Sequence, residues 1–310
     1  MERSIFRKNW KESGSDGMLS QRKQNRWGYL FIAPAIIGLV CFSLGPMLFS
    51  LGISFFQWDI ITPPVFAGLE NYREVFSDPL VKKSLSVTLI YTLITVPLIT
   101  AVPLLEALLL NVKVRGIAVF RTCFYIPSIV PMAANSAIWM YLYNPMFGPL
   151  NQILKTLNLP QGKFLYSMDS VLPCLAVMAV WFSGNTMIIY LARLKELPGE
   201  IYEAAALDGA GSWTKFRNLT VPLMTPVIFY NLVMAVIGTM QTFTQVYIMT
   251  EGGPANSSLL YAMLIYRNAF KQSKMGYSAA MSWVLFLLMG LITLILFKTS
   301  KYWVYEESGE

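Results

Sequence analysis

The stretch "EIYEAAALDGAGSWTKFRNLTVP", residues 200–222, is a short polar segment between two long apolar runs. The runs on either side, residues 171–192 and 223–249, are both long enough to cross a membrane, since a helix needs about 20 residues to span the hydrocarbon core. The segment around it, residues 194–222, is therefore expected to form a loop at one membrane surface. The side on which this loop lies sets the orientation of the whole chain.

The composition agrees with a membrane protein. The chain has 310 residues, of which 55% are hydrophobic and 13% are charged, and its mean hydropathy is +0.51. A soluble domain of this size would carry far more charge. The net charge of +7 comes largely from lysines and arginines that flank apolar runs, where such residues fix orientation in the bilayer. We therefore expect a lipid bilayer around the chain and no nucleic-acid partner.

Long gaps between charged residues predict six membrane-spanning helices. They lie near residues 27–56, 85–110, 117–143, 171–192, 223–249 and 278–297. Prolines and glycines interrupt several spans, and such breaks either shape packing or surround a cavity. We expect an all-α, six-span domain over residues 27–297, with an N-terminal segment over 1–26 and a tail over 298–310.

The orientation follows from the distribution of basic residues. An even number of spans places both termini on one side, and with cytoplasmic termini the inner segments hold about two thirds of the 24 lysines and arginines, as the positive-inside rule requires. The first apolar run is too long for a signal peptide and is expected to stay as an anchor. Both termini and the 194–222 loop are therefore predicted to be cytoplasmic.

Several kinds of chemistry are excluded or receive no support. The chain has no histidine, which removes a Ser-His-Asp triad, a Cys-His nucleophile and a His-ligated metal. Cys41, Cys123 and Cys174 lie inside apolar runs without metal-site spacing, so they are expected to be small buried hydrophobes. A G-x-x-x-x-G-K-[ST] nucleotide-binding motif is also missing. We expect no enzyme activity, no catalytic residue, no metal and no cofactor in this chain.

The 194–222 loop predicts two short helices at an angle on the membrane surface. Pro198 suits the first turn of a helix that ends near residue 208, and Glu200 lies near the positive end of its dipole. Gly209 and Gly211 supply a turn, and Ser212 is expected to cap the second helix.

One face of the first helix suits contact with another protein. Residues 204–206 are alanines, which allow a second surface to approach closely, and Glu203 and Asp208 offer charge to a cationic partner. We interpret the loop as a docking element.

A specific spacing pattern runs through this loop. The pattern E-A-A-x3-G-x9-[IL]-x-[LV]-P is matched at every fixed position, by Glu203, Ala204, Ala205, Gly209, Leu219, Val221 and Pro222. The loop thus resembles the EAA loop in permease subunits of binding-protein-dependent, ATP-driven importers. The position of the match, between two spans on the predicted cytoplasmic side, agrees with that resemblance.

Other segments resemble the carbohydrate-uptake branch of this family, and the resemblance covers roughly residues 27–297. The segments are "FAGLENYREVF" (66–76), "VFRTCFYIPSIVP" (119–131), "NPMFGPLNQIL" (144–154) and "TEGGPANSSLLYAMLIYRNAF" (250–270). The Gly252, Gly253, Pro254 element is typical of the first of two permease subunits, as in maltose-type and glycerol-3-phosphate-type transporters. The chain lacks the extra N-terminal spans and the large external insert of the maltose-type subunit, which argues against maltose itself.

The resemblance implies the type I importer permease fold in a prokaryotic cell membrane. It also implies four kinds of partner: a second homologous permease subunit, two cytoplasmic ATPase subunits, an external solute-binding protein and a sugar as the transported solute. In the family the EAA helix contacts the ATPase. We therefore expect coupling to involve Glu203, Ala204, Ala205, Asp208, Gly209, Trp213, Phe216 and Pro222.

The fifth predicted span is the most polar, and its polar residues recur at helical spacing along one face. Uncharged amides and hydroxyls suit sugar hydroxyls, but the same residues could instead bond neighbouring helices. In the fourth span Trp181 and Asn185 lie one turn apart, as a sugar-binding pair or as packing residues. The predicted substrate-path residues are Trp181, Asn185, Asn231, Thr239, Gln241, Thr242 and Gln245.

Two alternatives remain open from the sequence. A sugar phosphate such as glycerol-3-phosphate is a second possible solute, although the fifth span contains no Lys or Arg. An ion-coupled secondary transporter is the other, but Glu106 is the only acid inside a span, and an intramembrane carboxylate can serve a proton relay. We expect Glu106 instead to pair with Lys113 or Arg115, or to extend to the membrane surface.

Overall fold

The structure is a computed structural model that describes residues 28–112 and 114–305. The described residues form helices almost throughout, and the β-structure among them is one two-stranded antiparallel hairpin, β1 (Phe56–Gln57) with β2 (Val65–Phe66). The all-α prediction is confirmed. The predicted segment 1–26 and the last residues of the tail lie outside the described residues.

Four helical runs are long and apolar enough to cross a membrane. The first is Gly28–Ile53, which ends in the π-helical turn η1 (Val40–Leu44) and α2 (Gly45–Ile53). The second is α4 (Pro79–Leu110) and the fourth is α15 (Met275–Ser300). The third run, Ser212–Met249, comprises α11 (Ser212–Lys215), η3 (Phe216–Thr220), α12 (Val221–Met240) and α13 (Thr244–Met249).

Two further spans are bent. The helices α8 (Val171–Trp181) and α9 (Gly184–Glu196) meet at 48°, whereas α5 (Ile117–Ile129) and α6 (Met132–Leu142) meet at 102°. We expected residues 117–143 to form one span, but the helix breaks at Val130, whose backbone is extended. The cause is Pro131, since the residue before a proline is disfavoured in helical conformation. With each bent pair counted once, the described residues contain up to six spans.

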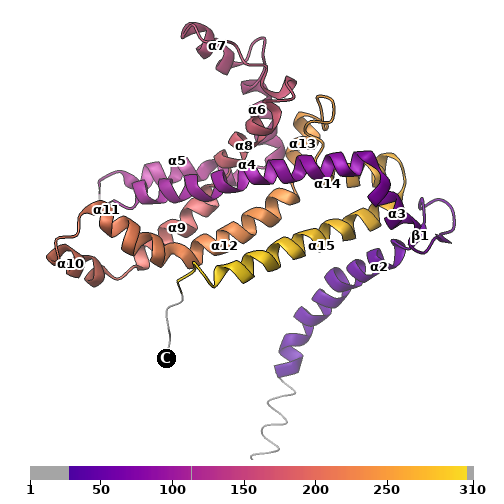
Figure 1. The fold of residues 1–310 in the computed structure, drawn as a ribbon, viewed down its shortest axis with the longest axis horizontal. Helices are drawn as coiled ribbons and strands as arrows, with labels where there is room; N and C mark the ends of the chain where they lie inside the picture. The colour runs from indigo at the N-terminus through magenta and orange to yellow at the C-terminus, as the bar shows by residue number, and fades with distance from the viewer. Residues whose placement is uncertain (1–27, 113, 306–310) are drawn as a thin grey trace, which may run out of the picture.

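The remaining helices are short and connect the spans. They are α3 (Glu70–Ser77), α7 (Pro149–Thr156), the 3-10 turn η2 (Phe164–Tyr166), α10 (Gly199–Leu207), α14 (Tyr261–Tyr266) and the π-helical turn η4 (Arg267–Lys271). The helices α10 and α11 lie at one end of the molecule, and α3 with the β-hairpin lies at the opposite end (Figure 1).

Packing between the spans forms two apolar clusters. The larger joins α4, α8, α14 and α15 and contains the fully buried Leu175, Met178 and Tyr261. The smaller one joins α4, α9 and the start of α12 through Ala107, Tyr190 and Met224. The second cluster lies where the spans approach α10 and α11, so it connects these helices to the rest of the bundle.

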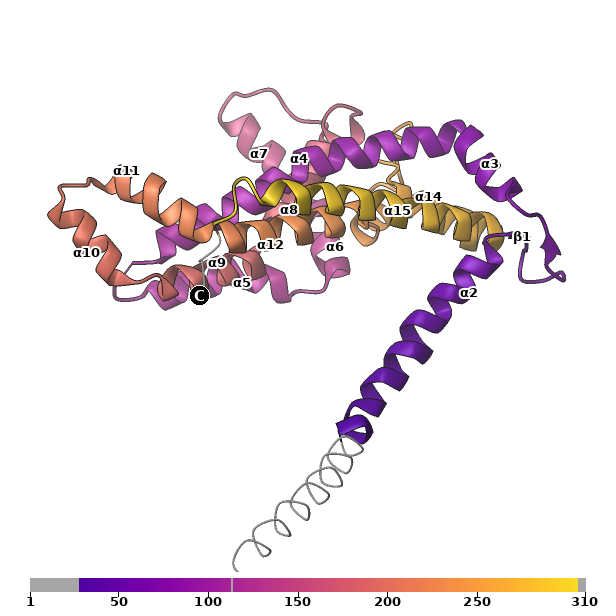
Figure 2. The same cartoon turned by 60° about the horizontal axis from the view of Figure 1, so that its bottom comes forward.

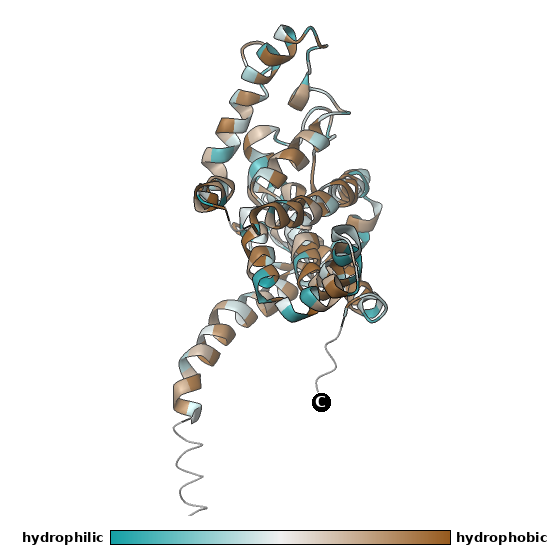
Figure 3. Cartoon of the chain, turned by 90° about the vertical axis from the view of Figure 1, so that its left-hand side faces the viewer, coloured by the Kyte–Doolittle hydropathy of each residue, from teal (hydrophilic) through white to brown (hydrophobic). Residues whose placement is uncertain are grey.

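The first span stands apart from the bundle as an arm, here defined as residues 28–53. Its most apolar window is 0% buried, compared with 33% for α4. The arm points away from the other helices (Figure 2), and like the bundle it contains many apolar residues, drawn in brown in Figure 3. It touches the bundle only near its last turns, where α2 lies against α15.

The junction between arm and bundle is tightly built. Asn71 of α3 is buried and donates its side-chain N–H groups to the carbonyls of Ser54, at 2.8 Å, and Phe56, at 2.9 Å. Gly276 of α15 lies so close to the Phe56 carbonyl that a Cβ there would overlap it. Two backbone groups at the end of the arm are therefore held by one amide side chain and one glycine.

Candidate functional site

The helices α10 and α11 form the predicted two-helix docking element. The first helix was predicted over residues 198–208. In the structure it is α10, Gly199–Leu207, with Pro198 as its N-cap residue. Gly209 has a φ of +79°, a backbone conformation that glycine adopts at little cost. The Ala210 amide then returns to the Ala205 carbonyl at 2.9 Å and closes the helix end.

The predicted capping role of Ser212 is wrong. The N-cap residue of α11 is Gly211, and no side chain caps this helix. Ser212 is the first helical residue, and its backbone has already entered the helix. A glycine serves as N-cap here because the turn from Gly209 to Gly211 sets the backbone direction without a side-chain acceptor.

The outer surface of this element is left open. Leu207 is 90% exposed and Trp213 is 70% exposed, and such apolar side chains at an exposed corner are typical of an interaction surface. Trp213 packs only against Phe216, with ring centroids 5.5 Å apart. The other predicted coupling residues divide simply: Glu203, Ala204, Asp208 and Gly209 are exposed, whereas Ala205, Phe216 and Pro222 are half-buried.

A short mechanical route connects the element to the bundle. The Tyr202 hydroxyl lies 3.0 Å from that of Thr220 and so joins α10 to the turn that leads into α12. Pro222 is the second residue of α12, and Met224, two residues further, is buried in the smaller apolar cluster. These contacts connect α10 to the start of α12 through side chains.

A polar cavity of about 280 Å³ lies further along α12. Its walls come from α4, α6, α8, α9, α12 and α13, and no Asp, Glu, Lys or Arg is among its lining residues. These residues are Tyr91, Thr95, Ile99, Met132, Ala179, Phe182, Ser183, Thr186, Asn231, Met234, Ala235, Gly238, Thr239, Thr242 and Gln245. The cavity offers hydroxyls and amides without a fixed charge, which is the complement of a neutral hydroxylated molecule.

One buried hydrogen bond organises the cavity wall. The Gln245 side-chain amide donates to the Tyr91 hydroxyl at 2.6 Å, and both residues are buried. Nearby, the hydroxyl of Thr95 is buried without a hydrogen-bond partner among the described residues.

The structure places four of the seven predicted substrate-path residues in this cavity and three outside it. Asn231, Thr239, Thr242 and Gln245 all line the cavity. Gln241 instead lies on the other face of the helix, where its amide contacts the sulfur of Met289 at 3.7 Å. The prediction extended the helix through Gln241. In the structure α12 ends at Met240, so Gln241 lies in the turn after it, where the chain changes direction.

Trp181 and Asn185 are not in this cavity. The fourth span presents Ala179, Phe182, Ser183 and Thr186 to it, whereas Asn185 is exposed. The sequence did hold a signal for the missed face, since residues 179, 182, 183 and 186 recur at helical spacing. Tyr91, Thr95 and Ile99 on α4 also line the cavity at a spacing of about one turn, and they are absent from the predicted path residues.

Trp181 lines a separate groove together with Glu106. This groove has a volume of about 400 Å³ and is otherwise mostly apolar. Trp181 packs edge to face against Trp139, with centroids 6.0 Å apart. We expected Glu106 to pair with Lys113 or Arg115, or to extend to the membrane surface. No ion pair with Arg115 forms, and Lys113 lies outside the described residues. Glu106 fails to reach Arg115 because its side chain faces this groove.

The cysteines also differ in part from expectation. Cys174 is buried as predicted, but Cys41 and Cys123 are exposed on the chain surface. Within a membrane such positions face lipid or a partner helix, so the apolar context in the sequence did not distinguish burial in protein from exposure to lipid. No group of three or more potential metal ligands occurs among the described residues.

Comparisons with known proteins agree with this geometry. A family model described as "Binding-protein-dependent transport system inner membrane component" matches residues 81–304. The chain is 43% identical over 306 residues to a probable ABC transporter permease protein, YesP, of Bacillus subtilis (strain 168), covering 96% of this chain and 99% of that one. It is 33% identical over 282 residues to the lactose transport system permease protein LacF of Rhizobium radiobacter, covering 88% and 94%.

A solved structure shares the fold. It is described as a bacterial alginate ABC transporter in complex with alginate pentasaccharide-bound periplasmic protein, and one of its chains matches with a TM-score of 0.80 at 21% identity. The match covers 91% of this chain and 96% of the other. The arrangement of spans described above is therefore that of a transporter permease.

Proposed function

The chain belongs to the family of binding-protein-dependent transport system inner membrane components, and from this premise we propose that it imports a sugar or oligosaccharide. It is a multi-pass membrane permease, and proteins similar to it are named as permease proteins. In such a system ATP is hydrolysed by a separate subunit. The proposal is that this chain forms one wall of the solute path and couples that path to the ATPase.

The observation that carries the proposal is the uncharged polar cavity on α12 and α13. Its donors and acceptors suit hydroxyl groups, and the Gln245–Tyr91 hydrogen bond fixes two of its lining side chains relative to each other. The cavity lies on the same helical run as the docking element. The relative named for lactose transport supports a sugar as the solute.

We assign the docking of a cytoplasmic ATPase to α10 and α11. The exposed Glu203 and Asp208 are suited to pair with cations of the partner, and the exposed Leu207 and Trp213 supply apolar contact area. The rigid connection through Tyr202 and Met224 supports transmission of a rigid-body motion. The basic residues near this end of the spans favour a cytoplasmic location for it.

The arm supports the presence of a second permease subunit. Its glycines at 38 and 45 are seven residues apart, and a Cβ at Gly38 would meet open space. Small residues at such intervals let two membrane helices approach closely. A second homologous permease is the occupant that this family offers, and it would also supply the opposite wall of the solute cavity.

The solute-binding protein is assigned to the membrane face opposite α10 and α11. The family is defined by dependence on such a protein, and the solved structural neighbour is described in complex with one. With α10 and α11 cytoplasmic, the face that carries α3, α14 and the β-hairpin is external (Figure 1).

The alternatives have less to support them. A sugar phosphate would need a cation, and no Lys or Arg lines the cavity. An ion-coupled transporter would not need a binding protein, whereas the family is named for that dependence. Glu106, the one acid inside a predicted span, lies in a different groove from the polar cavity.

Reconstitution of the complete importer tests the proposal. The permease pair, the ATPase and the binding protein are placed in proteoliposomes, and ATP hydrolysis is measured with neutral sugars, oligosaccharides and glycerol-3-phosphate. We expect stimulation by at least one neutral saccharide and none by glycerol-3-phosphate. Stimulation by the phosphate ester alone would refute the assignment of the solute.

A further inference from the structure

Two adjoining cavities lie at the outer end of the arm and share the indole of Trp58. The first has a volume of about 450 Å³ and a mixed lining that includes the polar or charged residues Gln57, Asp59, Asn71, Glu74, Gln272 and Lys274. The second has a volume of about 330 Å³ and is lined by Phe49, Gly52, Ile53, Phe56, Trp58 and Pro64. Trp58 thus lines both a cavity that contains charged groups and a cavity that is wholly apolar.

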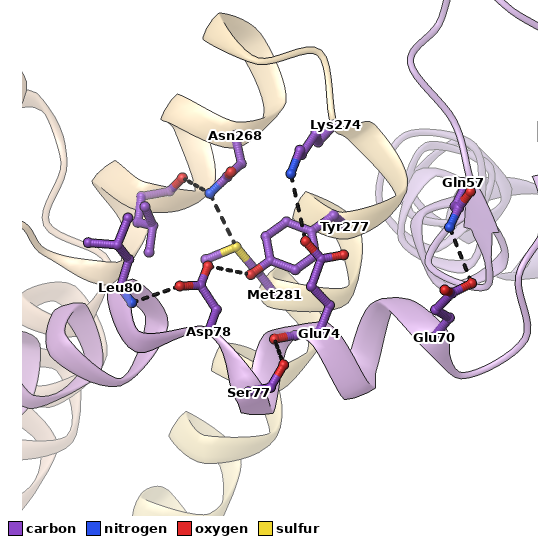
Figure 4. Close-up of polar contacts among 11 residues, drawn as sticks. Gln57, Glu70, Glu74, Ser77, Asp78, Leu80, Asn268, Lys274, Tyr277 and Met281 are labelled. Atoms are coloured by element: carbon purple, nitrogen blue, oxygen red, sulfur yellow. Dashed lines mark hydrogen bonds and ion pairs between the residues drawn. The ribbon is translucent and has the colours of Figure 1, made fainter.

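The polar cavity carries an excess of one negative charge. Glu74 and Lys274 form an ion pair at 3.7 Å, and both side chains remain about half exposed (Figure 4). Asp59 adds a second carboxylate. The backbone and side chain of Thr62 donate to it, both at 2.7 Å, and these hydrogen bonds lower the pKa of Asp59, so that it stays ionised at neutral pH. The cavity therefore favours a ligand that contains a cation.

The apolar cavity lies at the last turns of the first span, which supply Phe49, Gly52 and Ile53 to its lining. Ile53 is the last residue of the first span, and Trp58 is five residues further along the chain. Trp58 packs edge to face against Phe49 of that span, with centroids 6.4 Å apart. Tryptophan is enriched at the boundary between hydrocarbon and water, which places the shared wall of the two cavities at this boundary.

The loop around the cavities also presents apolar side chains outward. Ile61 is 85% exposed and Phe66 is 71% exposed, with Leu69 and Phe76 exposed beside them. The helix α3 is amphipathic and buries Asn71 and Val75 against the bundle. A short amphipathic helix and an apolar hairpin tip at the end of a span are typical of a segment that lies in the membrane interface.

We propose that these two cavities bind a phospholipid with a primary-amine headgroup, such as phosphatidylethanolamine. The ammonium group of the headgroup lies against Glu74 and Asp59, the phosphate faces Lys274, and one acyl chain follows the apolar cavity along Phe49 and Ile53. Two features favour this ligand. The charged groups of the first cavity complement the headgroup, and the adjoining apolar cavity can hold an acyl chain. The inference depends on the membrane location and not on which solute the permease carries.

The amine is the discriminating group. A primary ammonium offers three hydrogen-bond donors to carboxylates, as a lysine side chain does, whereas a trimethylated choline offers none and a glycerol headgroup leaves the lipid anionic. An anionic lipid would bring its charge to a cavity that already carries a negative excess. The order of binding is therefore expected to be ethanolamine first, choline second and glycerol last.

A lipid competition experiment tests this order without any mutation. The assembled importer is reconstituted in an equimolar mixture of the three phospholipids, and the lipids retained after detergent extraction are counted by native mass spectrometry. We expect the ethanolamine lipid to be retained about fivefold more than the choline lipid, as loss of charge-assisted hydrogen bonds would give. Equal retention of all three, or a preference for the glycerol lipid, would overturn the proposal.

Matched variants locate the site. Glu74→Gln and Trp58→Ala should each remove most of the ethanolamine preference. Glu251→Gln is the control, because Glu251 pairs with Lys271 at 3.8 Å in a similarly exposed bridge but does not line the cavity. An ethanolamine preference that survives Glu74→Gln and Trp58→Ala overturns the assignment. So does loss of binding-protein affinity in these variants with lipid retention unchanged, since the surface would then belong to that partner.

Discussion

The arm and α4 have almost the same apolar character but opposite surroundings. Their most apolar windows have mean hydropathies of 2.1 and 2.2, yet the window of the arm is 0% buried and that of α4 is 33% buried. Lipid tails are as apolar as leucine, so hydropathy identifies a span without identifying its neighbours. What distinguishes α4 is a set of buried hydroxyls at helical spacing, Ser84, Thr88, Thr92 and Thr95.

This comparison separates surfaces that the chain buries itself from those it leaves for partners. The bundle side of α4 and the polar cavity belong to the first kind, and the arm and the α10–α11 element belong to the second. Substitutions on buried surfaces should lower the stability of the chain. Substitutions on open surfaces should leave the chain stable and disturb assembly or coupling.

Glu203→Arg should have the largest effect on transport. It reverses a charge on the open surface of α10, and like charges placed in contact at an interface cost several kcal/mol. ATP-driven uptake in proteoliposomes should fall by about a hundredfold, while the thermal stability of the isolated chain stays unchanged. Glu196→Gln, which alters an exposed carboxylate paired with Arg193, is the control, and unchanged uptake in Glu203→Arg would remove α10 from the coupling role.

Gly276→Ala should act at the junction between the arm and the bundle. The new Cβ overlaps the Phe56 carbonyl, and overpacking of this kind costs about 1 to 3 kcal/mol. The arm should be displaced and recovery of the second permease by affinity purification should drop. Gly290→Ala, on the same helix with nothing within 4 Å of the added Cβ, should behave as wild type; equal behaviour of the two variants would show that the junction is not rigid.

Gly38→Leu should disturb only the open face of the arm. A Cβ here meets no atom within 4 Å in the isolated chain, so the chain itself should fold and insert normally. Association with the second permease should weaken by about tenfold, because close helix approach depends on the small residue. Gly290→Leu supplies the same change on α15, and if both variants assemble fully, the arm faces lipid alone.

Gln245→Leu should have the smallest effect on transport. It leaves the buried Tyr91 hydroxyl without its 2.6 Å partner, a loss of about 1 to 2 kcal/mol. Uptake should change by a few-fold or shift between sugars, and Thr242→Leu should do the same through the cavity wall. Gln241→Leu serves as the control because Gln241 lies outside the cavity; a larger transport effect in that variant would place the solute on the opposite face.

The features that sequence predicted well are those with local causes. Charge gaps of about 20 residues gave the spans because the hydrocarbon thickness sets helix length. The positions of Gly209 and Pro198 gave the two docking helices because each residue restricts or frees its own backbone. Four of the seven predicted path residues, Asn231, Thr239, Thr242 and Gln245, line one cavity because helical spacing orders them on one face.

The features that sequence missed depend on tertiary geometry. Trp181 was paired with Asn185 by spacing, but the 48° bend between α8 and α9 turns Trp181 toward Glu106 and Trp139. The contribution of Tyr91 to the cavity rests on a contact with Gln245, which is 154 positions away. The separation of the arm was also hidden, since its composition matches that of a packed span.

The most direct test of the account is uptake of labelled sugar into proteoliposomes that contain the assembled importer. We predict that accumulation requires both the binding protein outside and ATP at the ATPase side, and that it is insensitive to collapse of ion gradients. Uptake that proceeds without the ATPase and stops when an ion gradient is dissipated would contradict the assignment of this chain as the permease of an ATP-driven sugar importer.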